Sequence, residues 1–237
     1  MSQNLVIIPT YNEKENIEKM IHKVLSLKPD FDVLIIDDGS PDGSAQIVKN
    51  LQQTNSTKLY LLERKGKQGL GTTYIHGFKW ALEKDYNYIF EMDCDFSHNP
   101  DDLPRLLSAC ENGADVAIGS RYCKGGKVRN WPIGRVLMSY FASVYVRMVL
   151  WINITDTTAG FKCYKRKVLE TINLDKIKFM GYAFQIEMKY AALQKGFKVV
   201  EVPITFVDRI EGASKMSSGI FKEAFFGVIQ MRFAKRQ

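Results

Sequence analysis

At residues 33–43 the sequence reads Val33-Leu34-Ile35-Ile36-Asp37-Asp38-Gly39-Ser40-Pro41-Asp42-Gly43. Four apolar residues that run directly into acidic and turn-forming residues predict a short buried strand, a tight turn and a helix from about Ala45 to Leu51. An equally short apolar run, Leu5 to Ile8, is closed by Pro9. Asn12 with Glu15 three residues later indicates a capping box before an amphipathic helix. This repeated order of strand, turn and helix predicts an α/β fold.

The alternation continues to about residue 120. Further strands are predicted at Lys58 to Leu62, Tyr88 to Met92 and Val116 to Ile118, with helices ending near Trp80 and Cys110. Short, wholly apolar strands alternating with helices are typical of a mostly parallel central sheet that helices cover on both faces. The polar turns then meet at the carboxyl ends of the strands, where open α/β sheets bind ligands.

The second half of the chain has a looser pattern. It predicts a long helix, a short strand, a helix, a single strand and a final apolar and basic helix, at about residues 132–152, 162–164, 182–194, 199–207 and 217–234. The sequence has no internal repeat, and its length predicts a single domain over residues 1–237. The helices at 132–152 and 217–234 are amphipathic candidates for a membrane interface. Because Arg135 and Arg147 interrupt the first of them, we expect no transmembrane domain.

The composition narrows the class of partner. A formal net charge of +7 suits a ligand or surface rich in phosphate. Four cysteines without paired spacing and three scattered histidines argue against a zinc site, a disulfide framework or a catalytic triad, and they fit a reducing, cytoplasmic setting. Neither a P-loop nor a dinucleotide-binding glycine motif is present in the sequence.

Acidic residues stand at the ends of two predicted strands. Asp93 and Asp95 flank Cys94 and can share one hard cation with substrate phosphates. A solvated turn is the alternative, but the position at a strand end favours a metal site. Asp37-Asp38 can accept hydrogen bonds from a ribose or a base, or can cap the next helix. Tyr11 is placed either to pack on a base or to fill space.

Basic residues provide candidates for phosphate binding. Guanidinium groups match phosphate oxygens in a bidentate fashion, and the candidates are Arg121, Arg135, Arg209 and Lys215. Arg135 and Ser139 are four residues apart near the start of a predicted helix, so both can face one anion. Exposure to water is the alternative for any one of these side chains.

Five ordered motifs resemble the dolichol or polyprenol phosphate mannose synthases of glycosyltransferase family 2, inverting enzymes with the GT-A nucleotide-diphospho-sugar transferase fold. The motifs cover almost the whole chain and read Pro9-Thr10-Tyr11-Asn12-Glu13, Asp37-Asp38-Gly39-Ser40-Pro41-Asp42-Gly43, Asp93-Cys94-Asp95-Phe96-Ser97-His98, Gly119-Ser120-Arg121-Tyr122 and Arg209-Ile210-Glu211-Gly212-Ala213-Ser214-Lys215. The first two occur across the larger family and do not specify the sugar.

The resemblance implies a role for each matching residue. Donor binding falls to Pro9, Tyr11, Glu13, Ile36, Asp38, Asp93, Cys94, Asp95, Arg121, Val207, Arg209 and Lys215. Asp93 and Asp95 would hold Mg²⁺ or Mn²⁺, and Ser97, which stands where some relatives have an amide, is the weakest implied ligand. Arg121, Arg135 and Ser139 would bind the acceptor phosphate. Asp95, Arg121 and Arg209 are the implied catalytic residues.

The predicted reaction is inverting transfer of mannose from GDP-mannose to a polyprenyl or dolichyl phosphate. A phosphate monoester with a second pKa of about 6 is already ionised at neutral pH, so no histidine base is needed. The resemblance implies a peripheral protein on the cytoplasmic face of a membrane, with room for a separate membrane-anchor subunit. The alternatives are a glucosyltransferase that uses UDP-glucose, a non-catalytic nucleotide-sugar binder and a nucleic-acid-binding module. The acidic turns argue against nucleic acid as a partner.

Overall fold

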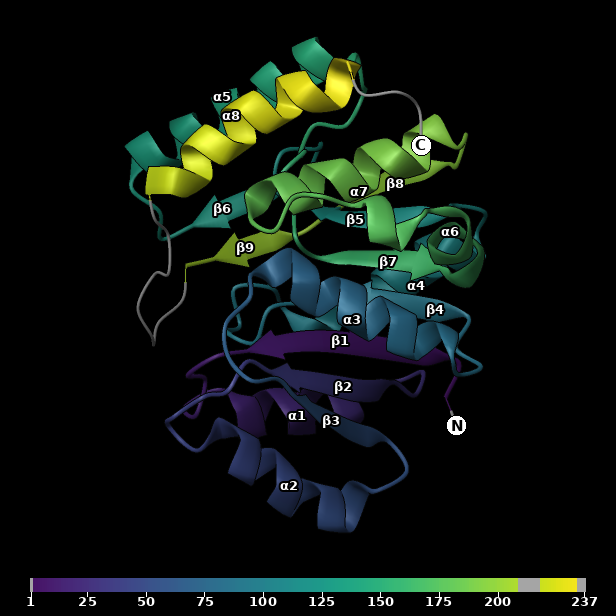
Figure 1. Ribbon diagram of the computed structural model, residues 1–237. Helices are drawn as coiled ribbons and strands as arrows, with labels where there is room; N and C mark the ends of the chain where they lie inside the picture. The colour runs from purple at the N-terminus through teal and green to yellow at the C-terminus, as the bar shows by residue number, and fades with distance from the viewer. Residues whose placement is uncertain (1, 209–217, 234–237) are drawn as a thin grey trace.

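A seven-stranded sheet forms the centre of the computed structural model, which describes residues 2–208 and 218–233 (Figure 1). The strand order is β3-β2-β1-β4-β7-β5-β8. The strands are β1 (Asn4–Thr10), β2 (Asp32–Asp37), β3 (Leu59–Glu63), β4 (Tyr88–Glu91), β5 (Val116–Ser120), β7 (Lys162–Lys165) and β8 (Val199–Pro203). Only β7 is antiparallel to its neighbours in this sheet, so the predicted mostly parallel sheet is confirmed.

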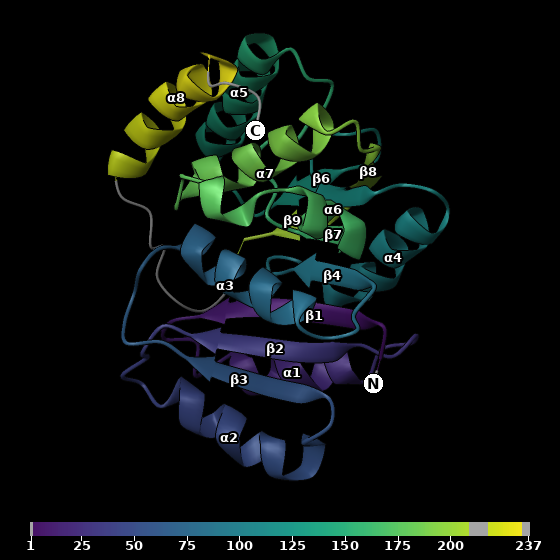
Figure 2. The same cartoon turned by 45° about the vertical axis from the view of Figure 1, so that its right-hand side comes forward.

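Helices cover both faces of the sheet, as predicted (Figures 1 and 2). One face packs against α3 (Leu70–Leu82), α6 (Arg166–Thr171) and α7 (Tyr182–Gln194), and the other packs against α1 (Ile17–Leu25), α2 (Ser44–Asn55) and α4 (Leu103–Glu111). Successive strand residues serve opposite faces: Ile7 belongs to the first cluster and Ile8 to the second. Two short 3-10 turns, Pro100–Asp102 and Leu174–Lys176, complete the connections.

The predicted capping box at Asn12 and Glu15 is wrong. Helix α1 begins only at Ile17, and Asn12 has a left-handed backbone with φ 56°. The amides of this segment are used elsewhere: the Asn12 N–H donates to Ser40 Oγ at 3.0 Å, and the Glu13 N–H donates to Ser44 Oγ at 3.1 Å. The loop after β1 is therefore fastened to the loop after β2 instead of opening a helix.

The predicted single strand at 199–207 is also wrong, because it divides at Ile204. β8 joins the large sheet, while β9 (Thr205–Val207) pairs in parallel with β6 (Lys127–Arg129), a strand that the sequence pattern did not predict. The buried Ile204 donates its N–H to the Ser120 carbonyl at 3.0 Å, and its own carbonyl accepts the Lys127 N–H at 2.9 Å. Its backbone thus passes from one sheet to the other, which carries β9 toward the carboxyl ends of β4 and β5.

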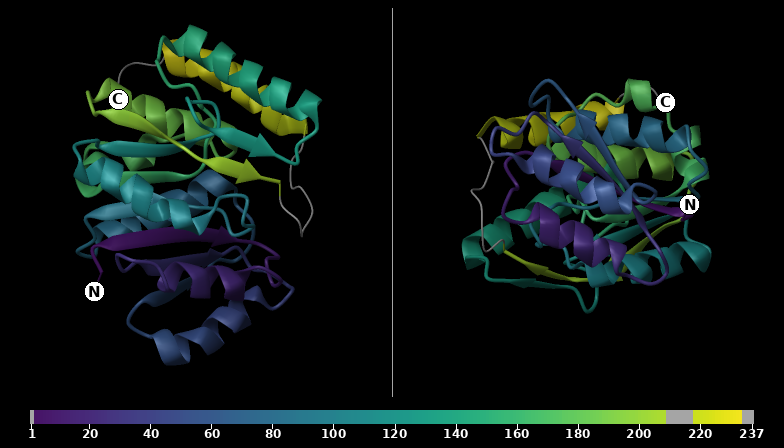
Figure 3. Two further views of the ribbon diagram at one scale, coloured as in Figure 1. Left: turned by 180° about the vertical axis from the view of Figure 1, so that it is seen from behind. Right: turned by 90° about the horizontal axis from the view of Figure 1, so that it is seen from below.

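Helices α5 (Ile133–Leu150) and α8 (Ser218–Phe233) lie side by side at one end of the molecule, outside α7 (Figures 1 and 3). Their inner sides form a small core with α7 that contains Val146, Leu150, Ala183, Ile186, Val228 and Met231. Within the described part of the chain, one helix, α5, is long and apolar enough by length and composition to cross a membrane, and 17% of it is buried.

Candidate active site

The loops after β1 and β2 form one edge of the site. Thr10 Oγ1 donates to Asp37 Oδ2 at 3.1 Å, and Asp37 also accepts the N–H of Ser40 at 2.8 Å. Asp37 is buried and holds the two loops together. Of the predicted pair Asp37-Asp38, the first residue therefore has a structural role within the turn.

Asp38 is paired with Arg64, which directly follows β3. The guanidinium donates to both carboxylate oxygens, from Nε at 2.7 Å and from Nη2 at 2.9 Å, and the two side chains are 7% and 8% exposed. Arg64 also donates to Thr72 Oγ1 at 3.1 Å and Thr73 Oγ1 at 2.6 Å, at the start of α3. This network holds Asp38 in a defined orientation at the end of β2.

The other predicted nucleoside residues surround this network. Tyr11 is half-buried, and the Lys67 ammonium lies 5.3 Å from its ring centroid. Glu13 is also half-buried. Pro9 and Ile36 are direct neighbours in the ladder between β1 and β2, but the Ile36 side chain is wholly buried against α3. Donor contacts of these residues remain predictions.

Asp93 and Asp95 follow β4, as predicted. The Asp93 side chain is 41% exposed, whereas Asp95 is largely buried and its Oδ1 accepts the Ser97 N–H at 3.0 Å. Ser97 is buried, its carbonyl accepts the Val207 N–H at 3.2 Å, and Val207 thus lies beside this loop. Cys94 is buried between the two carboxylates.

These residues fit a Mg²⁺ or Mn²⁺ ion that is shared with a substrate. Across residues 2–208 and 218–233 no cluster of three or more His, Cys, Asp or Glu side chains could hold a metal by itself. Mg²⁺ commonly takes one or two protein carboxylates and completes its shell with water and substrate phosphate oxygens. Two carboxylates, one of them partly exposed, match that donor set.

His98 lies next to the acidic pair but is not placed as a base. Its ring stacks on Phe161 at 5.1 Å and meets the edge of Phe206 at 5.3 Å, and its Nδ1 lies 3.7 Å from Asp93 Oδ2. Burial lowers the pKa of His98 to about 4.

Arg121, which follows β5, pairs with Asp156. Its Nε and Nη2 donate to the two carboxylate oxygens at 2.7 Å each, and Nη2 also donates to Thr158 Oγ1 at 2.8 Å. Burial favours the neutral forms of both groups, but their mutual attraction prevails: it raises the pKa of Arg121 and lowers that of Asp156. Arg121 is thus a fixed cation, 9% exposed.

Arg135 and Ser139 both lie on α5, as predicted, and the contacts of this helix bring them near Arg121. The Arg135 guanidinium donates to Asp208 at 3.1 Å and lies over the Trp131 ring, 4.0 Å from its centroid. Arg121 lies over the same ring at 5.6 Å. Ser139 lies close to the phenol of Tyr122, and burial raises the pKa of that phenol. The three predicted acceptor residues are therefore brought together.

Two buried lysines, which the motifs did not single out, lie beneath the site. Lys162 on β7 pairs with Glu91 at 2.9 Å, and Lys189 on α7 donates to the carbonyls of Thr157 and Ala159 at 2.8 Å each. Burial lowers the pKa of both ammonium groups, and that of Lys189 falls well below its ordinary value. Lys189 supports the loop that carries Asp156, and through it Arg121. An apolar helix pattern gives no signal for such a lysine.

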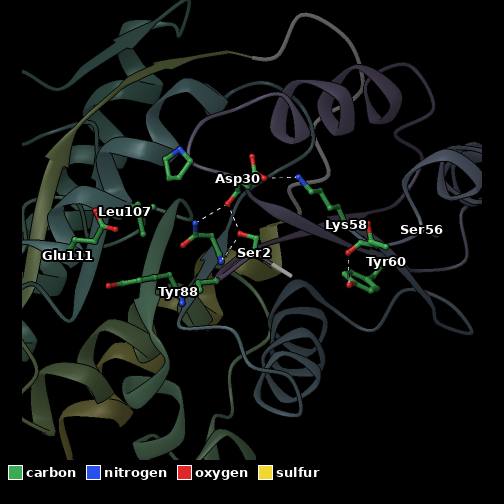
Figure 4. A pocket seen from close by; sticks show the side chains of 12 residues that line it. Ser2, Asp30, Ser56, Lys58, Tyr60, Tyr88, Leu107 and Glu111 are labelled. Carbon is green, nitrogen blue, oxygen red and sulfur yellow. Dashed lines mark hydrogen bonds and ion pairs between the residues drawn. The ribbon is translucent and has the colours of Figure 1, made fainter.

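Arg209 and Lys215 lie outside the described residues, so their predicted roles remain predictions. A hollow of about 830 Å³ lies elsewhere, between Asp30, Lys58, Tyr88 and Glu111 (Figure 4). It adjoins the amino ends of β1, β3 and β4, whereas the acidic pair and the arginines follow carboxyl ends. This hollow is not part of the candidate site.

A mostly parallel sheet with an acidic pair after β4 and guanidinium groups beside it defines the class of the protein: a nucleotide-diphospho-sugar glycosyltransferase with the GT-A fold. The chain belongs to glycosyltransferase family 2, since the profile described as Glycosyl transferase family 2 matches residues 5–172. The predicted family and fold are thereby confirmed, and membership favours an enzyme over a nucleic-acid-binding module.

Two curated relatives are similar along nearly the whole chain. A polyprenol monophosphomannose synthase from Mycolicibacterium smegmatis is 46% identical over 96% of this chain and 86% of its own length. An undecaprenyl-phosphate mannosyltransferase from Micrococcus luteus is 44% identical over 98% of this chain and 95% of its own length. Both names agree with the predicted resemblance.

Solved structures with low sequence identity share the fold. A glucosyl-3-phosphoglycerate synthase from Mycobacterium tuberculosis, in complex with Mn²⁺, UDP-glucose and phosphoglyceric acid, has a TM-score of 0.67 and 14% identity over 96% of this chain and 78% of that one. A mannosyltransferase from Pyrobaculum calidifontis, in complex with GDP-mannose and Mn²⁺, has a TM-score of 0.59 and 15% identity over 98% of this chain and 70% of that one.

Proposed function

We propose that this chain transfers mannose from GDP-mannose to a polyprenyl phosphate, with inversion at the sugar carbon, on the cytoplasmic face of a membrane. The observation that carries the proposal is the identity of 46% and 44%, along nearly the whole chain, with two enzymes named for mannose and a polyprenyl acceptor. Neither enzyme's name specifies the donor nucleotide; the GDP-mannose complex of the Pyrobaculum mannosyltransferase supports GDP-mannose as the donor.

The arrangement of charges supports the same reaction. The acidic pair and the two arginines are linked by ring contacts: His98, beside Asp93, meets Phe206 at 5.3 Å, and Arg121 lies over both Phe206 at 5.4 Å and Trp131 at 5.6 Å. A metal-bound donor diphosphate at the acidic pair and an acceptor phosphate at the arginines would be held close together despite their repulsion.

The chemistry requires positioning more than proton transfer. An ionised oxygen of the acceptor phosphate attacks the sugar carbon, and the bond from that carbon to the diphosphate oxygen breaks, so that GDP leaves with the electron pair. Asp93 and Asp95 would hold a divalent cation, which would supply Lewis-acid stabilisation of the charge on the leaving diphosphate. Arg121 and Arg135 bind the attacking phosphate and keep it in line.

The outer surface of α5 and α8 supports peripheral binding to a membrane. Large exposed apolar side chains of the described residues gather on or directly after α5 and on α8, apart from Met180 and Tyr182. They are Ile133, Leu137, Met138, Tyr140, Phe141, Met148, Trp151, Phe225, Phe226, Ile229 and Phe233. An apolar helical surface with basic residues at its edges is typical of proteins that lie in a membrane interface. Because α5 also carries Arg135 and Ser139, a lipid phosphate at that interface would be within reach of the site.

A donor and metal assay tests the proposal. We expect the purified chain to convert a short polyprenyl phosphate with GDP-mannose, to be inactive with UDP-glucose and to lose activity on chelation, with recovery on addition of Mg²⁺ or Mn²⁺. Asp95→Asn should lower kcat on the order of 100-fold or more, because a metal ligand is weakened. Binding of GDP, followed by calorimetry, reports the donor site independently of turnover.

Asp101→Asn is the matched control, since Asp101 lies close in sequence but pairs with Lys23 at the surface. It should retain full activity. Exclusive use of UDP-glucose, or full activity after exhaustive chelation, would contradict the proposal.

A further inference from the structure

The site contains an aromatic residue to which no role is yet assigned, Trp131. It stands just before α5, and Pro132 caps that helix through its carbonyl, which accepts the Arg135 N–H at 2.9 Å. Both candidate acceptor arginines lie over its ring, and Phe206 meets it edge-on at 5.2 Å. Trp131 therefore lies at the junction of the β5 loop, α5 and β9.

The Arg121 and Arg135 guanidinium groups are both positively charged, so their closeness requires stabilising contacts. In the described structure each arginine has its own carboxylate, Asp156 for Arg121 and Asp208 for Arg135. An aromatic face adds a second favourable contact for a cation without neutralising it. The Trp131 ring thus brings two guanidinium groups together while leaving their charge available to a third, anionic group.

The two arginines are held to different degrees. Arg121 makes side-chain hydrogen bonds to Asp156 and Thr158 and is almost fully buried. Arg135 is 29% exposed, and within residues 2–208 and 218–233 its side chain donates only to Asp208. An incoming phosphate can therefore replace Asp208 at Arg135, and the ring contact keeps that guanidinium in place during the exchange.

The indole N–H of Trp131 is buried and has no hydrogen-bond partner among the described residues. The nearby Tyr122 hydroxyl is also buried without a hydrogen-bond partner among the described residues. A buried donor without a partner is unfavourable and uncommon in native proteins. Next to two guanidinium groups, such a donor is complementary to a phosphate.

We propose that Trp131 is a positioning residue for the acceptor phosphate: its ring aligns Arg121 and Arg135, and its N–H donates to a phosphate oxygen. This inference rests on the proposed function, because it assigns the anion at these arginines to the polyprenyl phosphate.

Two substitutions separate the two parts of the role. Trp131→Phe keeps an aromatic face and removes the N–H, and Trp131→Leu removes both. We expect the KM for farnesyl monophosphate to rise on the order of tenfold in the first variant and on the order of 100-fold in the second, since hydrogen bonds to charged groups and cation–π contacts are both lost. The KM for GDP-mannose should change by less than about twofold in both.

Trp80→Phe is the matched control, because Trp80 is a half-buried residue of α3 that packs between Tyr60 and Tyr86. Its kinetic constants should equal those of the unaltered chain, and the thermal midpoints of all variants are compared to separate unfolding from loss of binding. An unchanged KM for farnesyl monophosphate in both Trp131 variants, or an equal rise in the KM for GDP-mannose, would overturn the proposal.

A binding experiment distinguishes failure of this inference from failure of the proposed function. The chain has three tryptophans, so a Trp80→Phe/Trp151→Phe background leaves Trp131 as the only indole fluorophore. Its emission should change saturably with farnesyl monophosphate, and Arg135→Ala should weaken that titration. A fluorescence response without any mannose transfer would support the phosphate-binding site and contradict the proposed reaction. Mannose transfer without a fluorescence response would contradict the role of Trp131.

Discussion

Asp38 depends on a residue that the sequence motifs did not single out, Arg64. The pair is almost wholly buried and joined by two hydrogen bonds, and Thr72 and Thr73 complete the coordination of the guanidinium. A sequence signal was present, because Arg64 directly follows β3 and Asp38 directly follows β2, and parallel neighbours end at the same edge. The strand pattern could have located both partners.

Removal of Arg64 should therefore be costly. We expect Arg64→Ala to lower the free energy of unfolding by about 3–5 kcal/mol, because the Asp38 carboxylate would remain buried without its partner. Denaturant unfolding measures the loss. Lys49→Ala is the control, since Lys49 pairs with Glu63 at half-exposed positions and should change stability by less than about 1 kcal/mol. Equal effects of the two substitutions would contradict this account.

The residues of the site were easier to predict than their partners. Asp93, Asp95, Arg121 and Arg135 were recognisable because strand ends and helix spacing bring them to one edge. Their counter-ions were not, since Asp156 lies 35 residues beyond Arg121 and Asp208 lies 73 beyond Arg135. Local patterns show which faces and ends a residue occupies, but pairing across such separations depends on the packed fold.

At the scale of elements, the segment 178–180 links α3, α7 and α8. The Glu187 carboxylate on α7 accepts the N–H groups of Lys178 and Phe179, and the Met180 carbonyl accepts the Gly71 N–H at 2.8 Å. A Cβ at Gly71 would lie 2.6 Å from the Phe179 carbonyl oxygen. The segment can lie this close to α3 only because residue 71 lacks a side chain.

Gly71→Ala should consequently lower the free energy of unfolding by about 1–3 kcal/mol, because the backbone of the segment has to move. Gly134→Ala is the helical control: nothing lies within 4 Å of its Cβ position, so it should be neutral or stabilise by up to about 1 kcal/mol. Thermal and denaturant unfolding of both variants provide the measurement. An unchanged free energy of unfolding in Gly71→Ala would contradict this prediction, because it would show that residues 178–180 can move without loss of stability.

Elements were predicted best where one periodicity ran without interruption, as in α7 and the first four strands. The errors at Asn12 and at residues 199–207 share a physical cause. In both places backbone N–H groups bond to a distant segment, Ser40 and Ser44 in the first case and Ser120 in the second. The local sequence gives no signal for such distant partners. It therefore favoured a regular helix start at Asn12 and one continuous strand at 199–207.

At the scale of the whole molecule, the chain has an apolar end beside its buried core, and α5 joins that end to the candidate site because it carries Arg135 and Ser139. The sheet buries its residues on both faces, whereas α5 and α8 bury only their inner sides against α7. Exposed apolar patches of this kind are uncommon on monomeric proteins that remain in water. The amphipathic pattern of these helices was visible in the sequence, but their pairing into one surface was not.

This surface yields the last prediction. The chain should float with vesicles that contain anionic lipid, and Phe141→Ser with Phe226→Ser should reduce the partition coefficient on the order of 100-fold, since each inserted phenylalanine contributes about 1.5–3 kcal/mol. Phe141 and Phe226 are 61% and 65% exposed, so their replacement should leave the thermal midpoint unchanged. Lys19→Ser on α1, at the opposite end of the molecule, is the control for nonspecific attraction (Figure 1). Equal flotation of the double variant and the unaltered chain would exclude this surface as the membrane contact, because the loss of one exposed phenylalanine from each helix would then have had no effect.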